Sequence, residues 1–132
     1  MRHRMNRLTV TAGLALAVVL AALMPATAAA QGNWYAEYFA NPSLQGGPVF
    51  TRYEQQINAD WGSGGPGNGV PADNFSARWT GSFWFDAGTH RFSYRSDDGL
   101  RLWIDNRLII DDWQEQQTAW TSLDTYVSRG TH

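Results

Sequence analysis

Two adjacent aspartates and a glycine, Asp97, Asp98 and Gly99, stand between two stretches of alternating apolar and polar residues. Carboxylate oxygens are the hard ligands that calcium prefers, and the ion takes about six to eight oxygens in proteins. Neighbouring side chains in a regular strand point to opposite faces, so both aspartates can reach one ion only if the backbone kinks between them. A cis peptide bond is one such kink. The same residues also suit an ordinary turn, because aspartate caps backbone donors and glycine accepts a positive φ.

The stretches on either side of this triplet predict a β-hairpin. Residues 89–95 place His90, Phe92 and Tyr94 on one face, and residues 100–105 alternate in the same way. Period-two alternation is typical of a half-buried strand. Two such strands joined by a short connection that contains glycine form a hairpin. The two aspartates are therefore expected at the apex of this hairpin.

The rest of the chain after Asn33 is also predicted to form strands. No stretch shows apolar residues repeating about every 3.6 positions, as they would on one face of a helix. Further strands are expected at residues 34–39, 48–53, 57–61, 75–80, 82–85, 108–110 and 118–127. The glycine-rich run 62–71 is predicted to be a surface loop. It is not expected to bind phosphate, because no Lys-Ser or Lys-Thr pair and no helix follows it. The pattern predicts one all-β unit, a barrel or a sandwich.

Residues 1–30 are predicted to be a secretory signal peptide that precedes a β domain over residues 33–132. A basic start is followed by an apolar stretch from Leu8 to Leu23 and by small residues up to Ala30. A retained N-terminal anchor is the alternative. No later stretch is long and apolar enough to span a membrane, so no membrane insertion is expected once the leader is removed. The protein is expected outside the cell or at the cell surface.

Charge and composition narrow the partners of the β domain. The leader holds three of the ten Lys and Arg residues and no Asp or Glu, so seven basic residues remain against twelve acidic ones. An acidic chain offers no cationic surface to nucleic acid, which is excluded as a partner. There is no cysteine and therefore no disulfide. All seven Trp follow the leader, and these rings can build a core or a ligand surface.

The run "FSARWTGSFWFDAGTHRFSYRSDDGLRLWIDNRLIIDDW" resembles the PA-fourteen domain, first described in the toxin subunit called protective antigen. The opening "WYAEYFANPSLQGGPVFTRY" resembles the first strands of that family, and the motifs agree in order and spacing. The resemblance implies an antiparallel β-barrel that occurs in secreted glycosidases, toxins and adhesins, often with a carbohydrate-binding role. In the sugar-binding members, two consecutive aspartates joined by a cis peptide hold calcium, and the ion coordinates sugar hydroxyls. Asp97 and Asp98 match these positions.

Two family features are not matched. The sugar-binding members complete their site with an Asn side chain and backbone carbonyls from a later loop, and their barrel closes with a strand rich in Glu-Tyr-Tyr. The printed sequence stops before either feature. We therefore expect a PA-fourteen barrel that lacks its C-terminal closing strand, with an incomplete site.

These observations predict a secreted, non-catalytic module that binds a glycan or cell-surface carbohydrate through calcium held by Asp97 and Asp98. Trp103 is the candidate ring for stacking on a sugar face. Catalysis is not expected, because cysteine is absent, histidine is scarce and no Gly-x-Ser-x-Gly elbow occurs. Two alternatives remain open. One is a structural or protein-interaction module in which the aspartates only close the turn, and the other is an accessory domain of a larger glycosidase.

The remaining polar residues that stand out are predicted to be structural. Asp105 is expected to shape a turn, and Asp111–Asp112 to end a strand. Arg78 is expected to form an ion pair. His90 is expected to pack in the core or at its rim, and His132 suggests no role.

Overall fold

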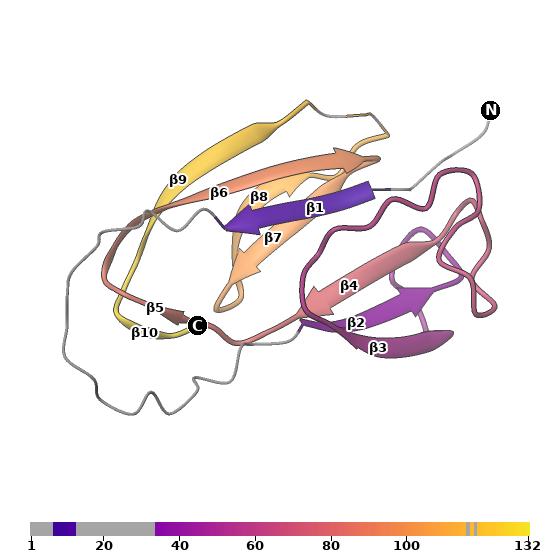
Figure 1. Cartoon of the computed structure of the whole chain (residues 1–132), viewed down its shortest axis with the longest axis horizontal. Coiled ribbons are helices and arrows are strands. Elements are labelled where there is room, and N and C mark those ends of the chain that lie inside the picture. Colours follow the sequence, from indigo (N-terminus) through magenta and orange to yellow (C-terminus); the bar gives the residue numbers. More distant parts are fainter. Residues whose placement is uncertain (1–6, 13–33, 116, 118) are drawn as a thin grey trace.

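The computed structural model describes residues 7–12, 34–115, 117 and 119–132. These residues form strands and no helix (Figure 1). The strands are β1 (Arg7–Ala12), β2 (Trp34–Phe39), β3 (Phe50–Glu54), β4 (Ser76–Thr80), β5 (Trp84–Phe85), β6 (Gly88–Asp97), β7 (Leu100–Ile104), β8 (Arg107–Asp112), β9 (Thr121–Val127) and β10 (Gly130–Thr131). The predicted all-β class is confirmed. No helix in the described part of the chain is long and apolar enough to cross a membrane.

The strands pair antiparallel in four small sheets. Their orders are β3-β2-β4, β1-β6-β9, β7-β8 and β5-β10. Figure 1 shows the β3-β2-β4 sheet on one side of the molecule and the strands β6, β7, β8 and β9 on the other. Among the described strands no closed barrel forms, because no strand pairing joins one sheet to the next. The prediction was a barrel or sandwich without its closing strand, and the antiparallel all-β architecture agrees with it.

Two clusters of buried apolar side chains form the core. The first belongs to β6, β7, β8 and β9, and the second to β2 and β4 with the loop before β4. Their buried members are Phe92, Tyr94, Leu100, Ile110 and Val127 in the first cluster and Ala36, Tyr38, Val70 and Phe75 in the second. Both clusters are rich in aromatic rings, which supply much contact area in a small domain without disulfides.

The predicted hairpin is confirmed as β6 and β7. In β6 the side chains of Phe92 and Tyr94 are buried and those of Arg91 and Arg95 are exposed, as the alternation requires. One predicted strand is wrong, because residues 57–61 contain no strand. The apolar residues Ile57 and Trp61 led to this prediction, but their side chains pack inward from an irregular loop.

The strand β1 lies inside the predicted signal peptide. Its backbone pairs antiparallel with β6, in a register that runs from Arg7 opposite Asp97 to Ala12 opposite Phe92. The rest of the predicted leader, residues 1–6 and 13–30, lies outside the described residues. The leader therefore stays a prediction, and β1 occupies an edge of β6.

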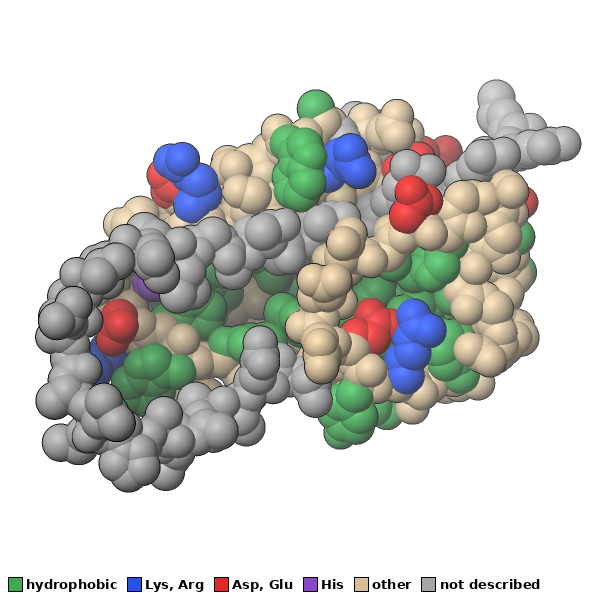
Figure 2. Space-filling view, in the orientation of Figure 1, with side chains coloured by type: hydrophobic (Ala, Val, Ile, Leu, Met, Phe, Trp, Pro, Cys, Tyr) green, Lys and Arg blue, Asp and Glu red, His purple; other side chains and the backbone are tan. Residues whose placement is uncertain are grey.

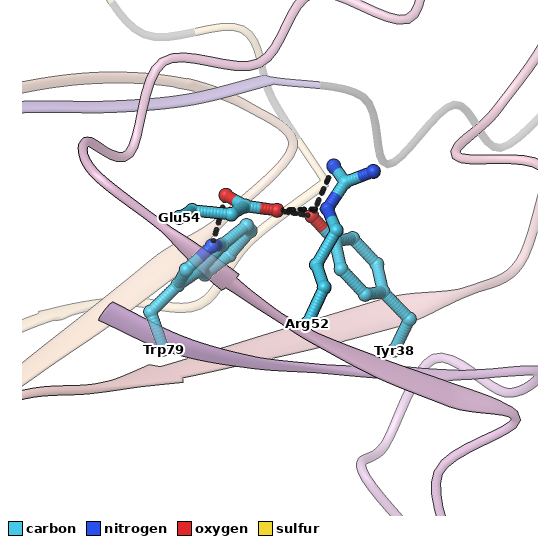
Figure 3. Close-up of polar contacts among 4 residues, drawn as sticks. All are labelled: Tyr38, Arg52, Glu54 and Trp79. Carbon is cyan, nitrogen blue, oxygen red and sulfur yellow. Dashed lines mark hydrogen bonds and ion pairs between the residues drawn. The ribbon is translucent and has the colours of Figure 1, made fainter. Parts of the chain in front are cut away.

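One carboxylate joins all three strands of the β3-β2-β4 sheet (Figure 3). Glu54 of β3 accepts hydrogen bonds from the Tyr38 hydroxyl of β2 at 2.5 Å and from Trp79 Nε1 of β4 at 2.9 Å. Arg52 Nε donates to the same carboxylate at 2.5 Å. The Glu54 side chain is 13% exposed. Burial acts to raise the pKa of Glu54, but the hydrogen bonds from Tyr38, Trp79 and Arg52 outweigh it and hold the pKa below its usual value.

Replacing Glu54 with Gln should destabilise the fold by about 1–3 kcal/mol. The amide has one acceptor oxygen, so whichever way it is turned, its NH₂ faces either Arg52 or Trp79, and both of these groups can only donate. Urea unfolding of the full chain measures the change. Asp124→Asn is the matched control, because it removes a pair with Arg91 in which both side chains are exposed. That control should cost less than about 1 kcal/mol, and equal losses in the two variants would contradict the proposed importance of Glu54.

Candidate functional site

The two aspartates occupy the apex of the β6–β7 hairpin. Asp97 ends β6, Asp98 and Gly99 follow, and β7 begins at Leu100. The kink expected between the aspartates is present, because their peptide bond is cis. Both residues are half-buried and line the same cavity, of about 830 Å³. The alternation of a regular strand would have sent them to opposite faces.

Gly99 fixes where this apex lies. A Cβ atom on Gly99 would come within 2.4 Å of the Gln114 amide nitrogen and 2.5 Å of the Asp112 carbonyl oxygen. It would also lie 2.7 Å from the Trp113 Cα atom. These are backbone atoms and cannot swing away, so only glycine allows the apex to pack against the end of β8 and the residues that follow it. Gly99 therefore allows close packing of the hairpin apex against the end of β8 and the two residues after it.

Trp103 lines the same cavity as the aspartates. It lies on β7, and 48% of its surface is exposed although it is a large apolar residue. The three residues predicted as the ligand site are therefore brought to one cavity. The structure also places other rings in its lining: Trp34, Trp61, Phe75, Trp79, Phe83, Phe85, Phe92 and Trp113.

Asp97 makes a polar contact with the segment after β8. Gln117 Nε2 donates to Asp97 Oδ2 at 3.5 Å, which is a long hydrogen bond. Within the described ranges, no group of three or more His, Cys, Asp or Glu side chains is placed to hold a metal ion. The pair can thus supply only part of a coordination shell, and backbone carbonyls, water or a ligand would have to supply the rest.

Asp105 and Asn106 form the turn between β7 and β8. Both have positive φ, 50° and 63°, which is the signature of a type I′ hairpin turn. The predicted turn role of Asp105 is confirmed. The structure adds a second role, because Asp105 Oδ2 lies 2.5 Å from Nδ1 of the His132 ring.

The contact between the His132 ring and Asp105 was not predicted from the sequence. The ring Nδ1 faces the Asp105 carboxylate, and the ring Nε2 lies 3.0 Å from the carbonyl oxygen of Ser128. Both partners are acceptors, so the ring makes both contacts as a donor only when it is protonated. The hydrogen bond to Asp105 raises the pKa of His132 above its usual value, and the Ser128 carbonyl adds to the effect. The ring ties the end of β10 to the β7–β8 turn. Asp105 lies 27 positions away in the sequence, so no local pattern signals the pair.

The other polar residues take the structural roles predicted for them. Arg78 makes a two-point ion pair with Glu37, at 2.6 and 2.9 Å. Asp111 and Asp112 end β8 and face different partners, since Asp111 pairs with Arg101 at 2.6 Å and Asp112 lies 3.4 Å from the Tyr94 hydroxyl.

His90 is half-buried at the rim of the core, and its Nε2 lies 2.8 Å from the Asp86 carbonyl oxygen. This is one of the two places predicted for it. On the face shown in Figure 2, acidic side chains lie beside basic ones. The charges on this face are therefore interspersed and do not form a continuous basic patch.

These features define an all-β domain of antiparallel sheets, with a carboxylate pair at a hairpin apex beside an aromatic cavity. The family model of the PA14 domain matches residues 29–131. The chain therefore belongs to the PA14 domain family, and the resemblance found in the sequence is confirmed.

A curated relative is the anti-sigma-I factor RsgI3 of Acetivibrio thermocellus. It is 38% identical over 82 residues, which make up 61% of this chain and 13% of the relative. The chain therefore spans only about an eighth of the relative's length. No solved structure matches the chain.

The contact between His132 and Asp105 should stabilise the fold at low pH and lose this effect as pH rises. Because the pKa of His132 is higher in the folded chain, its contribution is fully present below the unfolded value of about 6.5 and is lost as pH passes through the folded pKa. Thermal unfolding of the wild type and of His132→Gln should therefore differ more near pH 5.5 than near pH 9. Asp105→Asn is the control and should remove this pH dependence. A gap in melting temperature that is the same at both pH values would contradict the assignment.

Proposed function

We propose that the protein is a non-catalytic carbohydrate-binding module in which Asp97 and Asp98 hold calcium and the ion coordinates glycan hydroxyls. The supporting observation is that both carboxylates line one cavity together with Trp103. Membership of the PA14 domain family supports the same proposal, as does the acidic balance of the β domain. The proposal includes a secreted or cell-surface location.

The chemistry of the pair suits a ligand with neighbouring hydroxyl groups. Two carboxylates supply at most about four of the roughly six to eight oxygens that calcium takes. The remaining positions can accept two vicinal hydroxyls, backbone carbonyls or water. Two hydroxyls on one ion must have a fixed relative geometry, so the ion would discriminate between sugars that differ in stereochemistry.

The exposed ring of Trp103 supplies the second element of such a site. Aromatic rings present a negative face that attracts the weakly positive hydrogens of an apolar surface. The C–H face of a pyranose is a surface of this kind. Trp103 lines the cavity with about half of its surface exposed, and it lies five residues along the chain from Asp98, which is about 16 Å in a strand. A glycan of two or more sugar units would therefore place one unit at the ion and the apolar face of another against this ring.

Calcium should bind the full chain, and binding should disappear when Asp97→Ala and Asp98→Ala are combined. Isothermal titration with calcium chloride measures the effect. The matched control combines Asp111→Ala with Asp112→Ala, because this second pair of adjacent aspartates faces two different partners. The control should bind calcium as the wild type does. Binding to the wild type no stronger than to the Asp97/Asp98 variant would sink the calcium proposal.

Glycan binding should depend both on calcium and on Trp103. On a glycan array, the wild type should bind a set of glycans in calcium and lose them in EDTA. Trp103→Ala should weaken binding by roughly three- to tenfold, which corresponds to about 0.5–1.5 kcal/mol of ring contact. Trp84→Ala is the matched control, because Trp84 is 61% exposed on β5 and does not line the cavity. Equal losses in the two variants would show that Trp103 is not a ligand contact.

A further inference from the structure

The outer face of β6 and β9 carries a ladder of paired polar side chains. The core cluster lies beneath these two strands, so alternate side chains point to solvent. Arg91 of β6 and Asp124 of β9 form a two-point ion pair at 2.7 and 2.8 Å. Next to them, the hydroxyl groups of Ser93 and Ser122 lie 2.9 Å apart. The polar groups in the middle of this face are therefore paired with one another.

An exposed aromatic ring stands at each end of this ladder. Trp120, just before β9, is 55% exposed, and Tyr126, near the end of β9, is 63% exposed. The two residues are six positions apart, which keeps both on one face of the strand and separates them by about 20 Å. A ligand that touches both rings must therefore be extended along the strand.

Arg95 gives this face a positive charge that no carboxylate neutralises. Its guanidinium carbon lies 5.6 Å from the centroid of the Trp120 ring, and it forms no ion pair with any residue that the structure describes. Asp97, two positions further along β6, lines the cavity and accepts a hydrogen bond from Gln117. A guanidinium that is stacked on a ring keeps N–H groups at its edge, where they can bind a carboxylate at two points. Figure 2 shows a hydrophobic side chain beside a basic one over β6 and β9.

The order of these groups argues against a protein partner. The centre of a protein interface is apolar and contributes most of the binding energy, and its rim is polar. On this face the centre consists of an ion pair and two hydroxyl groups, and the rings lie at the ends. A glycan chain suits this order, because its units have apolar C–H faces for the rings and hydroxyl groups for the polar ladder between them.

The charge of the domain limits how acidic such a glycan can be. Seven basic residues stand against twelve acidic ones after the predicted leader, so a continuous polyanion is repelled. The face itself offers one guanidinium that lacks a carboxylate partner among the described residues. These two facts favour a mostly neutral chain that carries isolated carboxylates.

We propose that the outer face of β6 and β9 binds an extended, mostly neutral glycan that carries a uronic acid unit. Arg95 binds the carboxylate of this unit, whose sugar ring packs against the exposed part of Trp120. A unit further along the chain stacks on Tyr126. The surface uses neither Asp97 nor Asp98 and needs no metal ion, so it goes beyond the calcium site and can be tested apart from it.

Affinity electrophoresis of the full chain in EDTA, through gels that contain glucuronoxylan, tests the role of the charge. The wild type should be retarded, with at least about tenfold lower affinity for the same polymer after its carboxylates have been reduced to alcohols. Arg95→Gln should bind both polymers equally weakly. Arg107→Gln is the matched control, because it removes the same charge from an exposed position on β8, and it should bind as the wild type does.

The same gels test the two rings. Trp120→Ala and Tyr126→Ala should each lower the affinity for glucuronoxylan by roughly three- to tenfold. Tyr53→Ala is the matched control, because this ring is 71% exposed on β3 in another sheet, and its affinity should not change. Equal retardation by the two polymers, or equal losses in the control variants, would overturn the proposal. Retardation that requires calcium and disappears in the Asp97/Asp98 variant would also overturn it, because the calcium site would then be the one that binds.

Discussion

The β3-β2-β4 sheet depends on the Glu54 carboxylate, which takes a hydrogen bond from each of its three strands. An ionised carboxylate is costly to bury unless its oxygens are paired, and here both of them are. The same contacts orient the Tyr38 ring, which stacks on Phe50 at 4.5 Å between centroids and meets Trp79 edge-on at 5.8 Å. Through Trp79 this interaction sets the position of β4. One wall of the cavity is thus fixed by polar contacts inside an aromatic cluster.

The cavity joins two different chemical surfaces. Asp97 and Asp98 lie beside the start of β7, whereas the exposed ring of Trp103 lies near its end. Five residues of a strand span about 16 Å, so a ligand that reached both surfaces would have to be longer than one sugar ring.

Local patterns predicted the parts of this structure that local chemistry decides. The alternation around Phe92 and Tyr94 predicted the hairpin, and the two aspartates at its apex proved to line one cavity. The same rule failed at residues 57–61, because a buried Ile57 can be carried by an irregular loop as well as by a strand. The partner of His132 could not be predicted either, since Asp105 is brought to it only by the packing of β10 near the β7–β8 turn. Likewise, the cavity depends on how two sheets lie against each other, and a one-dimensional pattern does not encode that distance.

Gly99, which follows the aspartates, reports on packing and not on ligand binding, and this affects how the motif should be searched for. Gly99 is required by the backbone that crosses over it, at Asp112, Trp113 and Gln114, whether or not a ligand is bound nearby. A glycine at this place would persist in a relative that had lost every metal-binding group, because a side chain there would push two segments of the fold apart. In an alignment, the glycine therefore diagnoses the hairpin packing, and the two preceding acidic positions carry the information about chemistry. A search for binding members should weight those two positions and disregard the third.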